Sequence, residues 1–167
     1  MRIRRFFLSL LLGLMLLLSG CQSGSTTSSA PTPRPMPDAP LISLSFSEHH
    51  SYRARVQGYE FRQDDGQYTA SFDLADEEDP YPVAVDQAWV DTLTSFIRQY
   101  DMMTWDGFRG SDSMLLDGTQ FSIHFTFADG TAAHASGYGS FPAGYGNASA
   151  AIKAHFLQLL PEDMRTW

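Results

Sequence analysis

Residues 121–131 read Phe-Ser-Ile-His-Phe-Thr-Phe-Ala-Asp-Gly-Thr, and with the residues that follow they predict the best-defined structural unit of the chain. Large apolar side chains occupy every second position from 121 to 127, which is the period of a β-strand with one buried face. Asp129-Gly130 is a hairpin turn signal, and residues 131–138 form the returning strand. The stretch therefore predicts an antiparallel hairpin that faces the core with four side chains: Phe121, Ile123, Phe125 and Phe127.

The turn also places the two histidines of this hairpin. A two-residue Asp129-Gly130 turn sets His134 opposite Phe125 and His124 opposite Ala135. The two imidazoles are then expected on different faces of the sheet, and a bulged turn would be needed to bring them together. Because the pair also lacks an obvious third ligand, the sequence predicts no metal site.

Three further strands are expected before the hairpin. Residues 41–48 alternate serine with apolar side chains, and residues 51–62 continue with the same period. Gly58 marks a β-bulge, because the apolar side chains change parity after it. Asp64-Asp65-Gly66 is a second hairpin turn signal, and residues 68–74 alternate again as the third strand.

Two helices complete the predicted domain. Asp86 is the expected N-cap of the first helix, whose apolar side chains recur at three and four residues. Asn147 is the expected cap of the second helix, which Pro161 ends. The sequence thus predicts a monomeric α+β domain over residues 41–167, with about five antiparallel strands in one sheet and two helices packed on one face.

The amino terminus has the organisation of a removable signal peptide. Residues 1–5 contain three arginines, and Phe6 to Leu18 is an apolar run that is short for a transmembrane span. Ser19 and Gly20 supply small residues at a cleavage site, which makes residues 1–20 the predicted signal. Cys21, the only cysteine of the chain, follows directly, so no disulfide framework is available.

The run Leu18-Ser19-Gly20-Cys21 resembles the bacterial lipobox. The resemblance implies that the thiol of Cys21 carries a diacylglycerol and that the signal is cut before it. Two or three acyl chains on one residue anchor a protein far more firmly than a single chain. We therefore expect a lipoprotein of the bacterial cell envelope that is held at a membrane through Cys21 and faces away from the cytoplasm.

Residues 21–40 join this anchor to the domain. The segment after Cys21 is rich in Ser, Thr and Pro and nearly free of large hydrophobic side chains, which predicts a disordered tether. Loss of residues 1–20 removes three arginines and no acid, leaving 8 basic and 19 acidic side chains and a formal charge of −11. Such a surface disfavours nucleic acid and is repelled by anionic lipid headgroups.

Four aromatic residues in turn-rich stretches are the candidate ligand-binding residues: Trp105, Tyr138, Phe141 and Tyr145. If several of them are exposed together, their flat faces form a platform for a glycan or a peptide. The alternative is that they fill a second small core under long loops. Exposure separates the two interpretations, and the sequence does not give exposure.

A second resemblance rests on turn and core residues along the domain. Trp105-Asp106-Gly107-Phe108, Asp117-Gly118, Phe127-Ala128-Asp129-Gly130 and Phe141-Pro142 succeed one another as in a group of bacterial envelope lipoproteins of unknown function. The resemblance implies a single domain across roughly residues 41–160. It implies no activity.

Two classes of function remain open from the sequence. The first is a non-enzymatic domain that binds an envelope component or a partner protein. The second is a hydrolase of cell-wall or extracellular material, working through a carboxylate or a histidine in the glycine-rich region. No Gly-x-Ser-x-Gly elbow is present, and Gly137-Tyr138-Gly139-Ser140 lacks the lysine of a phosphate-binding loop. We therefore predict no catalytic residue and no cofactor.

Overall fold

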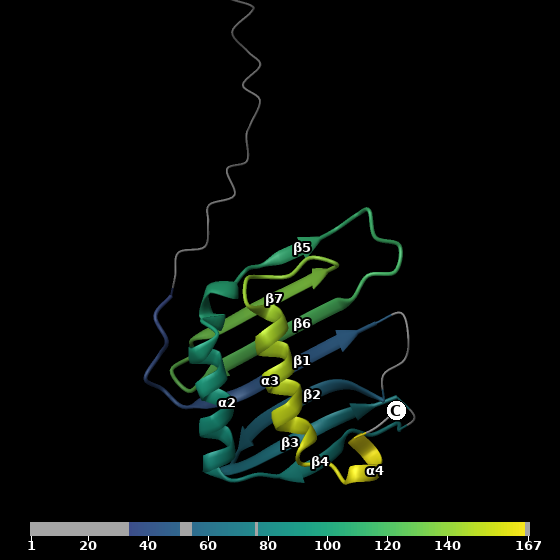
Figure 1. Cartoon of the computed structure of the whole chain (residues 1–167). Helices are drawn as coiled ribbons and strands as arrows, with labels where there is room; N and C mark the ends of the chain where they lie inside the picture. The colour runs from purple at the N-terminus through teal and green to yellow at the C-terminus, as the bar shows by residue number, and fades with distance from the viewer. Residues whose placement is uncertain (1–33, 51–54, 76, 166–167) are drawn as a thin grey trace, which may run out of the picture. The chain divides into compact units, whose positions relative to one another are not determined.

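A seven-stranded sheet dominates the computed structural model, which describes residues 34–50, 55–75 and 77–165 (Figure 1). All neighbouring strands are antiparallel except β5, which runs parallel to β7 and makes the sheet mixed. In spatial order the strands are β4 (Tyr81–Ala84), β3 (Gln67–Leu74), β2 (Val56–Asp64), β1 (Leu41–His49), β6 (Gln120–Phe127), β7 (Ala132–Tyr138) and β5 (Arg109–Ser111).

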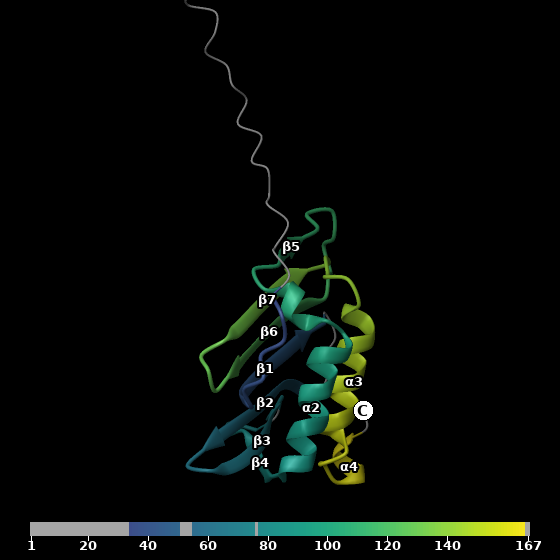
Figure 2. The ribbon, with the colours of Figure 1, turned by 90° about the vertical axis from the view of Figure 1, so that its left-hand side faces the viewer.

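Two long helices cover one face of this sheet. They are α2 (Gln87–Gln99) and α3 (Tyr145–Leu157), and Figure 2 shows both on the same side of the strands. A 3-10 turn, η1 (Met102–Trp105), follows α2, and a short helix, α4 (Glu162–Arg165), follows α3. The predicted α+β class is confirmed, whereas the structure has more strands and one more helix than the sequence indicated.

The apolar parity of the predicted strands is the buried parity. Phe121, Ile123, Phe125 and Phe127 of β6 are all at most 2% exposed. The predicted bulge in β2 is also present, since the register with β3 shifts between Val56 and Gly58. These strands therefore place their large side chains between the sheet and the two helices.

The register predicted for the β6–β7 hairpin is wrong by one residue. The N–H of Phe127 donates to the oxygen of Thr131 at 2.8 Å, so the turn contains three residues, of which Gly130 is left-handed with φ 84°. The N–H of Gly130 donates to the oxygen of Phe127 at 2.9 Å. The extra residue makes this a bulged turn and sets His124 opposite His134. The two rings lie on one face of the sheet, with centroids 6.2 Å apart.

The two strands that the sequence did not reveal lie at the two edges of the sheet. β4 contains Pro82, a residue that sheets accept at an edge. β5 has only three residues and pairs Gly110 with Gly137 of β7. Neither strand carries a long alternation of apolar side chains, so the sequence pattern did not indicate them. Each pairs through its backbone with one neighbouring strand.

Of the two predicted helix N-caps, the cap of α2 is confirmed and the cap of α3 is wrong. The side chain of Asp86 accepts a hydrogen bond from the N–H of Trp89 at 2.9 Å, as predicted for the N-cap of α2. Asn147 is not the cap of α3, because the helix begins earlier, after Gly144. Gly144 has φ 77°, a left-handed conformation that glycine adopts without strain.

The chain before β1 is packed on the domain from Arg34 onward. Arg34 is paired with Asp106 and donates to the oxygen of Ala132 at 3.3 Å. Met36 and Ala39 contact the core. These residues belong to the stretch assigned to the tether by composition. Residues 21–33 of that stretch, with Cys21, lie outside the described residues.

Replacement of Phe125 by alanine should lower the free energy of unfolding by about 3–5 kcal/mol, because the ring is fully buried and would leave a cavity. Chemical denaturation measures this change. Thr126→Ala is the matched control on the other face of β6, and we expect a change of about 0.5 kcal/mol or less. A loss below about 1 kcal/mol for Phe125→Ala would contradict the burial of this face.

Candidate functional site

A largely buried carboxylate interrupts the apolar face at the end of β1. Leu44 and Phe46 point into the core, and Glu48 follows them on the same parity. The side chain of Glu48 is only 10% exposed. Because a charge in such surroundings is costly unless it is paired and hydrogen-bonded, its partners define the site.

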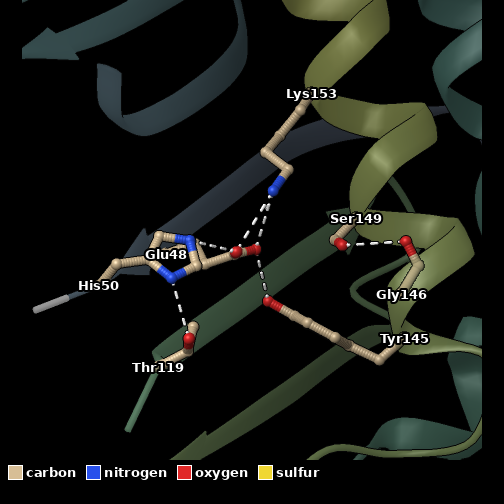
Figure 3. Close-up of polar contacts among 7 residues, drawn as sticks. All are labelled: Glu48, His50, Thr119, Tyr145, Gly146, Ser149 and Lys153. Carbon is tan, nitrogen blue, oxygen red and sulfur yellow. Dashed lines mark hydrogen bonds and ion pairs between the residues drawn. The ribbon is translucent and has the colours of Figure 1, made fainter. Parts of the chain in front are cut away.

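Three side chains surround the carboxylate of Glu48 (Figure 3). The hydroxyl of Tyr145 donates to one oxygen at 2.9 Å. The Nζ of Lys153 lies 3.2 Å from each oxygen, and the Nε2 of His50 lies 2.8 Å from one of them. Tyr145 and Lys153 both come from α3, so the carboxylate connects the end of β1 to this helix.

The charge of Glu48 acts on the tyrosines around it. Burial, together with the negative charge of Glu48 and its hydrogen bond, raises the pKa of Tyr145 well above the usual value for a phenol. Burial and the same carboxylate raise the pKa of Tyr59 to about 12. Both phenols therefore keep their protons at neutral pH, and Tyr145 remains a hydrogen-bond donor to Glu48.

His50 extends the network from Glu48 to a hydroxyl. The carboxylate of Glu48 only accepts hydrogen bonds, so the Nε2 of His50 carries the proton between them. In the neutral ring the Nδ1 is then an acceptor, and it lies 2.9 Å from the Oγ1 of Thr119. The result is a chain of carboxylate, imidazole and hydroxyl.

A surface hollow of about 500 Å³ opens beside this network. Its walls come from the end of β1, from the residue before β6 and from the start of α3. No side chain caps α3. The lining residues are Glu48, Thr119, Phe141, Pro142, Gly144, Tyr145, Gly146, Asn147 and Ser149.

An aromatic pair forms one wall of the hollow. The ring of Phe141 stacks on that of Tyr145 with centroids 4.7 Å apart and an interplanar angle of 25°. Phe141 is 39% exposed, whereas Tyr145 is 7% exposed. The hollow therefore presents an accessible aromatic ring, held from behind by a buried one.

The structure brings three of the four sequence-predicted aromatic residues together. Trp105 lies 6.0 Å from Tyr145 between ring centroids, and its Nε1 donates to the oxygen of Ala143 at 3.1 Å. Trp105 is only 4% exposed and supports the wall from the core side. Tyr138 does not line the hollow; its hydroxyl donates to the oxygen of Leu116 at 2.9 Å.

Sequence reasoning missed the polar side chains of the site, namely Glu48, His50, Thr119 and Lys153. One signal was present, because Glu48 occupies the apolar parity of a predicted strand, where a charge is unexpected. The other three residues carried no such signal. Their proximity depends on the packing of α3 on the sheet and on the pairing of β6 with β1.

Comparison with known proteins assigns no activity to this site. The chain matches no protein-family model and, at a significant level, no curated protein. None of the helices within the described ranges has the length and hydropathy of a membrane span. The same part of the chain holds no cluster of three or more His, Cys, Asp or Glu side chains suited to a metal ion.

Replacement of Glu48 by glutamine should lower the free energy of unfolding by about 2–3 kcal/mol, because it leaves the ammonium of Lys153 without its counter-charge. Chemical denaturation at neutral pH measures this effect. Glu60→Gln is the matched control, since Glu60 pairs with Arg62 at the surface and such pairs contribute little. Equal small effects of both substitutions would contradict a structural role for the Glu48 network.

Proposed function

We propose that this protein is a lipid-anchored envelope protein whose domain binds a glycan in the hollow beside Glu48. The observation that carries the proposal is the exposed ring of Phe141, which is stacked on Tyr145 at the rim of a hollow that also contains the carboxylate of Glu48 and the hydroxyl of Thr119. Sugars offer an apolar face of C–H groups to an aromatic ring and hydroxyls around their edge. The hollow offers a ring, a carboxylate and a hydroxyl side by side.

The size and preorganisation of the hollow support this binding role. Its volume of about 500 Å³ lies within the range of small-ligand sites. Tyr145 is fixed by its bond to Glu48, and the hydroxyl of Thr119 is fixed by His50. Ligand contacts on such fixed groups cost little conformational entropy on binding.

The arrangement of acids favours a binder over a glycosidase. Glycosidases use two carboxyl groups that flank the scissile bond. Among the described residues that line the hollow, Glu48 is the single carboxylate. Both of its oxygens already contact Lys153.

A second candidate function follows from the chain of Glu48, His50 and Thr119. A nucleophile within hydrogen-bond reach of a base, with the base oriented by a third group, is the general arrangement of acyl hydrolases. Here the hydroxyl of Thr119 would attack a carbonyl, its proton would pass to His50, and Glu48 would stabilise the imidazolium. The bond to the leaving group would then break as His50 returns the proton to it, and water would hydrolyse the resulting ester of Thr119. The first residues of α3, from Tyr145 to Asn147, line the same hollow, where an oxyanion would need hydrogen-bond donors.

The anchor rests on Cys21 and on the hydrophobic run that precedes it. Replacement of Cys21 by serine should release the protein from membranes or leave an uncleaved precursor, because no thiol remains for acylation. Membrane fractionation and the mass of the mature form measure this outcome. Normal fractionation with a mature form of normal size would contradict the anchor.

Calorimetry measures the binding of two soluble probes, which are a cell-wall disaccharide and the stem peptide of the same cell wall. We expect the disaccharide to bind and Phe141→Ala to weaken it about threefold to tenfold, because the substitution removes the stacking face. Leu116→Ala is the control, since Leu116 is an exposed apolar residue outside the hollow. The melting temperature of each variant shows whether the domain is intact.

Three other outcomes of this experiment are informative. Binding of the stem peptide alone would make the ligand a peptide. When an acylated disaccharide is added as a third probe, its hydrolysis by the protein, lost in Thr119→Val, would favour the second candidate. Absence of binding and of hydrolysis would contradict a ligand site in this hollow.

A further inference from the structure

Three consecutive apolar residues stand at the surface between β5 and β6. Met114, Leu115 and Leu116 are 88%, 43% and 94% exposed. Single exposed apolar residues are ordinary, but a contiguous group at one loop tip marks an interaction site in many proteins. The hollow beside Glu48 does not include this tip.

The backbone of this loop is fixed by hydrogen bonds. The N–H of Asp112 donates to the oxygen of Tyr138 at 2.9 Å, and the side chain of Asp112 accepts from the N–H of Met114 at 3.0 Å. The hydroxyl of Tyr138 donates to the oxygen of Leu116 and accepts from the N–H of Gly118, both at 2.9 Å. The loop that carries the three apolar residues therefore has a defined conformation, and the side chain of Tyr138 stabilises it.

The tip follows the end of β5, the strand at one edge of the sheet (Figure 1). Arg34 contacts Asp106, just before β5, and the oxygen of Ala132 at the start of β7. The thirteen residues from Cys21 to Pro33 span at most about 45 Å. Since the seven residues of β7 span about 20 Å, an anchor on Cys21 leaves the tip within reach of the bilayer.

We propose that Met114, Leu115 and Leu116 insert into the surface of the bilayer to which Cys21 is anchored. The inference rests on the proposed lipid anchor. Anchoring raises the local concentration of lipid at the tip, so a contact that is weak for a free domain becomes populated. Each buried leucine contributes the equivalent of about tenfold in partitioning or more.

The charges around the tip decide which membrane surface it prefers. Asp112 and Asp117 flank the apolar residues, and Arg109 of β5 is the nearest cation along the chain. The acidic chain as a whole is repelled by anionic headgroups. Insertion is therefore driven by apolar contact and should be stronger in zwitterionic than in anionic vesicles.

The test places a tryptophan at the tip of the complete mature protein. Leu116→Trp is compared with Glu78→Trp, an exposed position beside β4 at the opposite edge of the sheet. Each protein is anchored to phosphatidylcholine vesicles that contain brominated acyl chains, which quench tryptophan only at close contact. We expect quenching and a blue shift of the added emission at position 116, and neither at position 78.

The outcomes separate the tip from the anchor. Failure of the purified protein to remain on vesicles would contradict the lipid anchor; coupling of the Cys21 thiol to a maleimide lipid then restores the tether, and the same quenching is measured. Equal emission of the two tryptophans on anchored protein would overturn the proposal. A blue shift that appears without vesicles and grows with protein concentration would assign the tip to a second copy of the chain and would overturn it as well.

Discussion

The burial of one face of the sheet is the constraint on which the rest of the structure depends. Side chains alternate across a strand, so β1, β2, β3, β6 and β7 each direct a row of apolar groups to the same side. That face must be removed from water, and α2 and α3 lie across it (Figure 2). The aromatic rings of Phe72 and Phe156, 5.9 Å apart between centroids, show how closely sheet and helix meet.

The site arises where this constraint is broken. Glu48 continues the inward row of β1 and carries a charge into the space between sheet and helix. The fold accommodates the charge by directing Tyr145 and Lys153 of α3 and His50 of the strand end toward it (Figure 3). A local departure from the apolar pattern that is satisfied by several distant partners is a common property of functional sites.

The proposed roles of the domain are divided between two regions around β6 and β7. The hollow beside Glu48 opens at the start of α3, whereas the apolar tip extends from the loop between β5 and β6. Tyr138, which the sequence suggested as a ligand residue, instead holds the tip through two hydrogen bonds of its hydroxyl. In this arrangement one protein would hold itself at a bilayer and still present an open aromatic site.

The sequence by itself determined the elements whose cause is local. The period of apolar residues located five strands, and the bulge at Gly58 follows from a parity change. Asp86 caps α2 because its side chain accepts from the backbone N–H of Trp89, three residues later. The Asp-Gly turns mark the limit of this reasoning. Asp65-Gly66 forms a two-residue turn with both residues left-handed, whereas at Asp129-Gly130 only the glycine is left-handed and a third residue joins the turn. The geometry of the second turn, which the residue types alone do not specify, decided the register of β6 and β7. Tertiary structure alone decided the parallel pairing of β5 and the meeting of Glu48 with Lys153, because these depend on contacts between segments far apart in the chain.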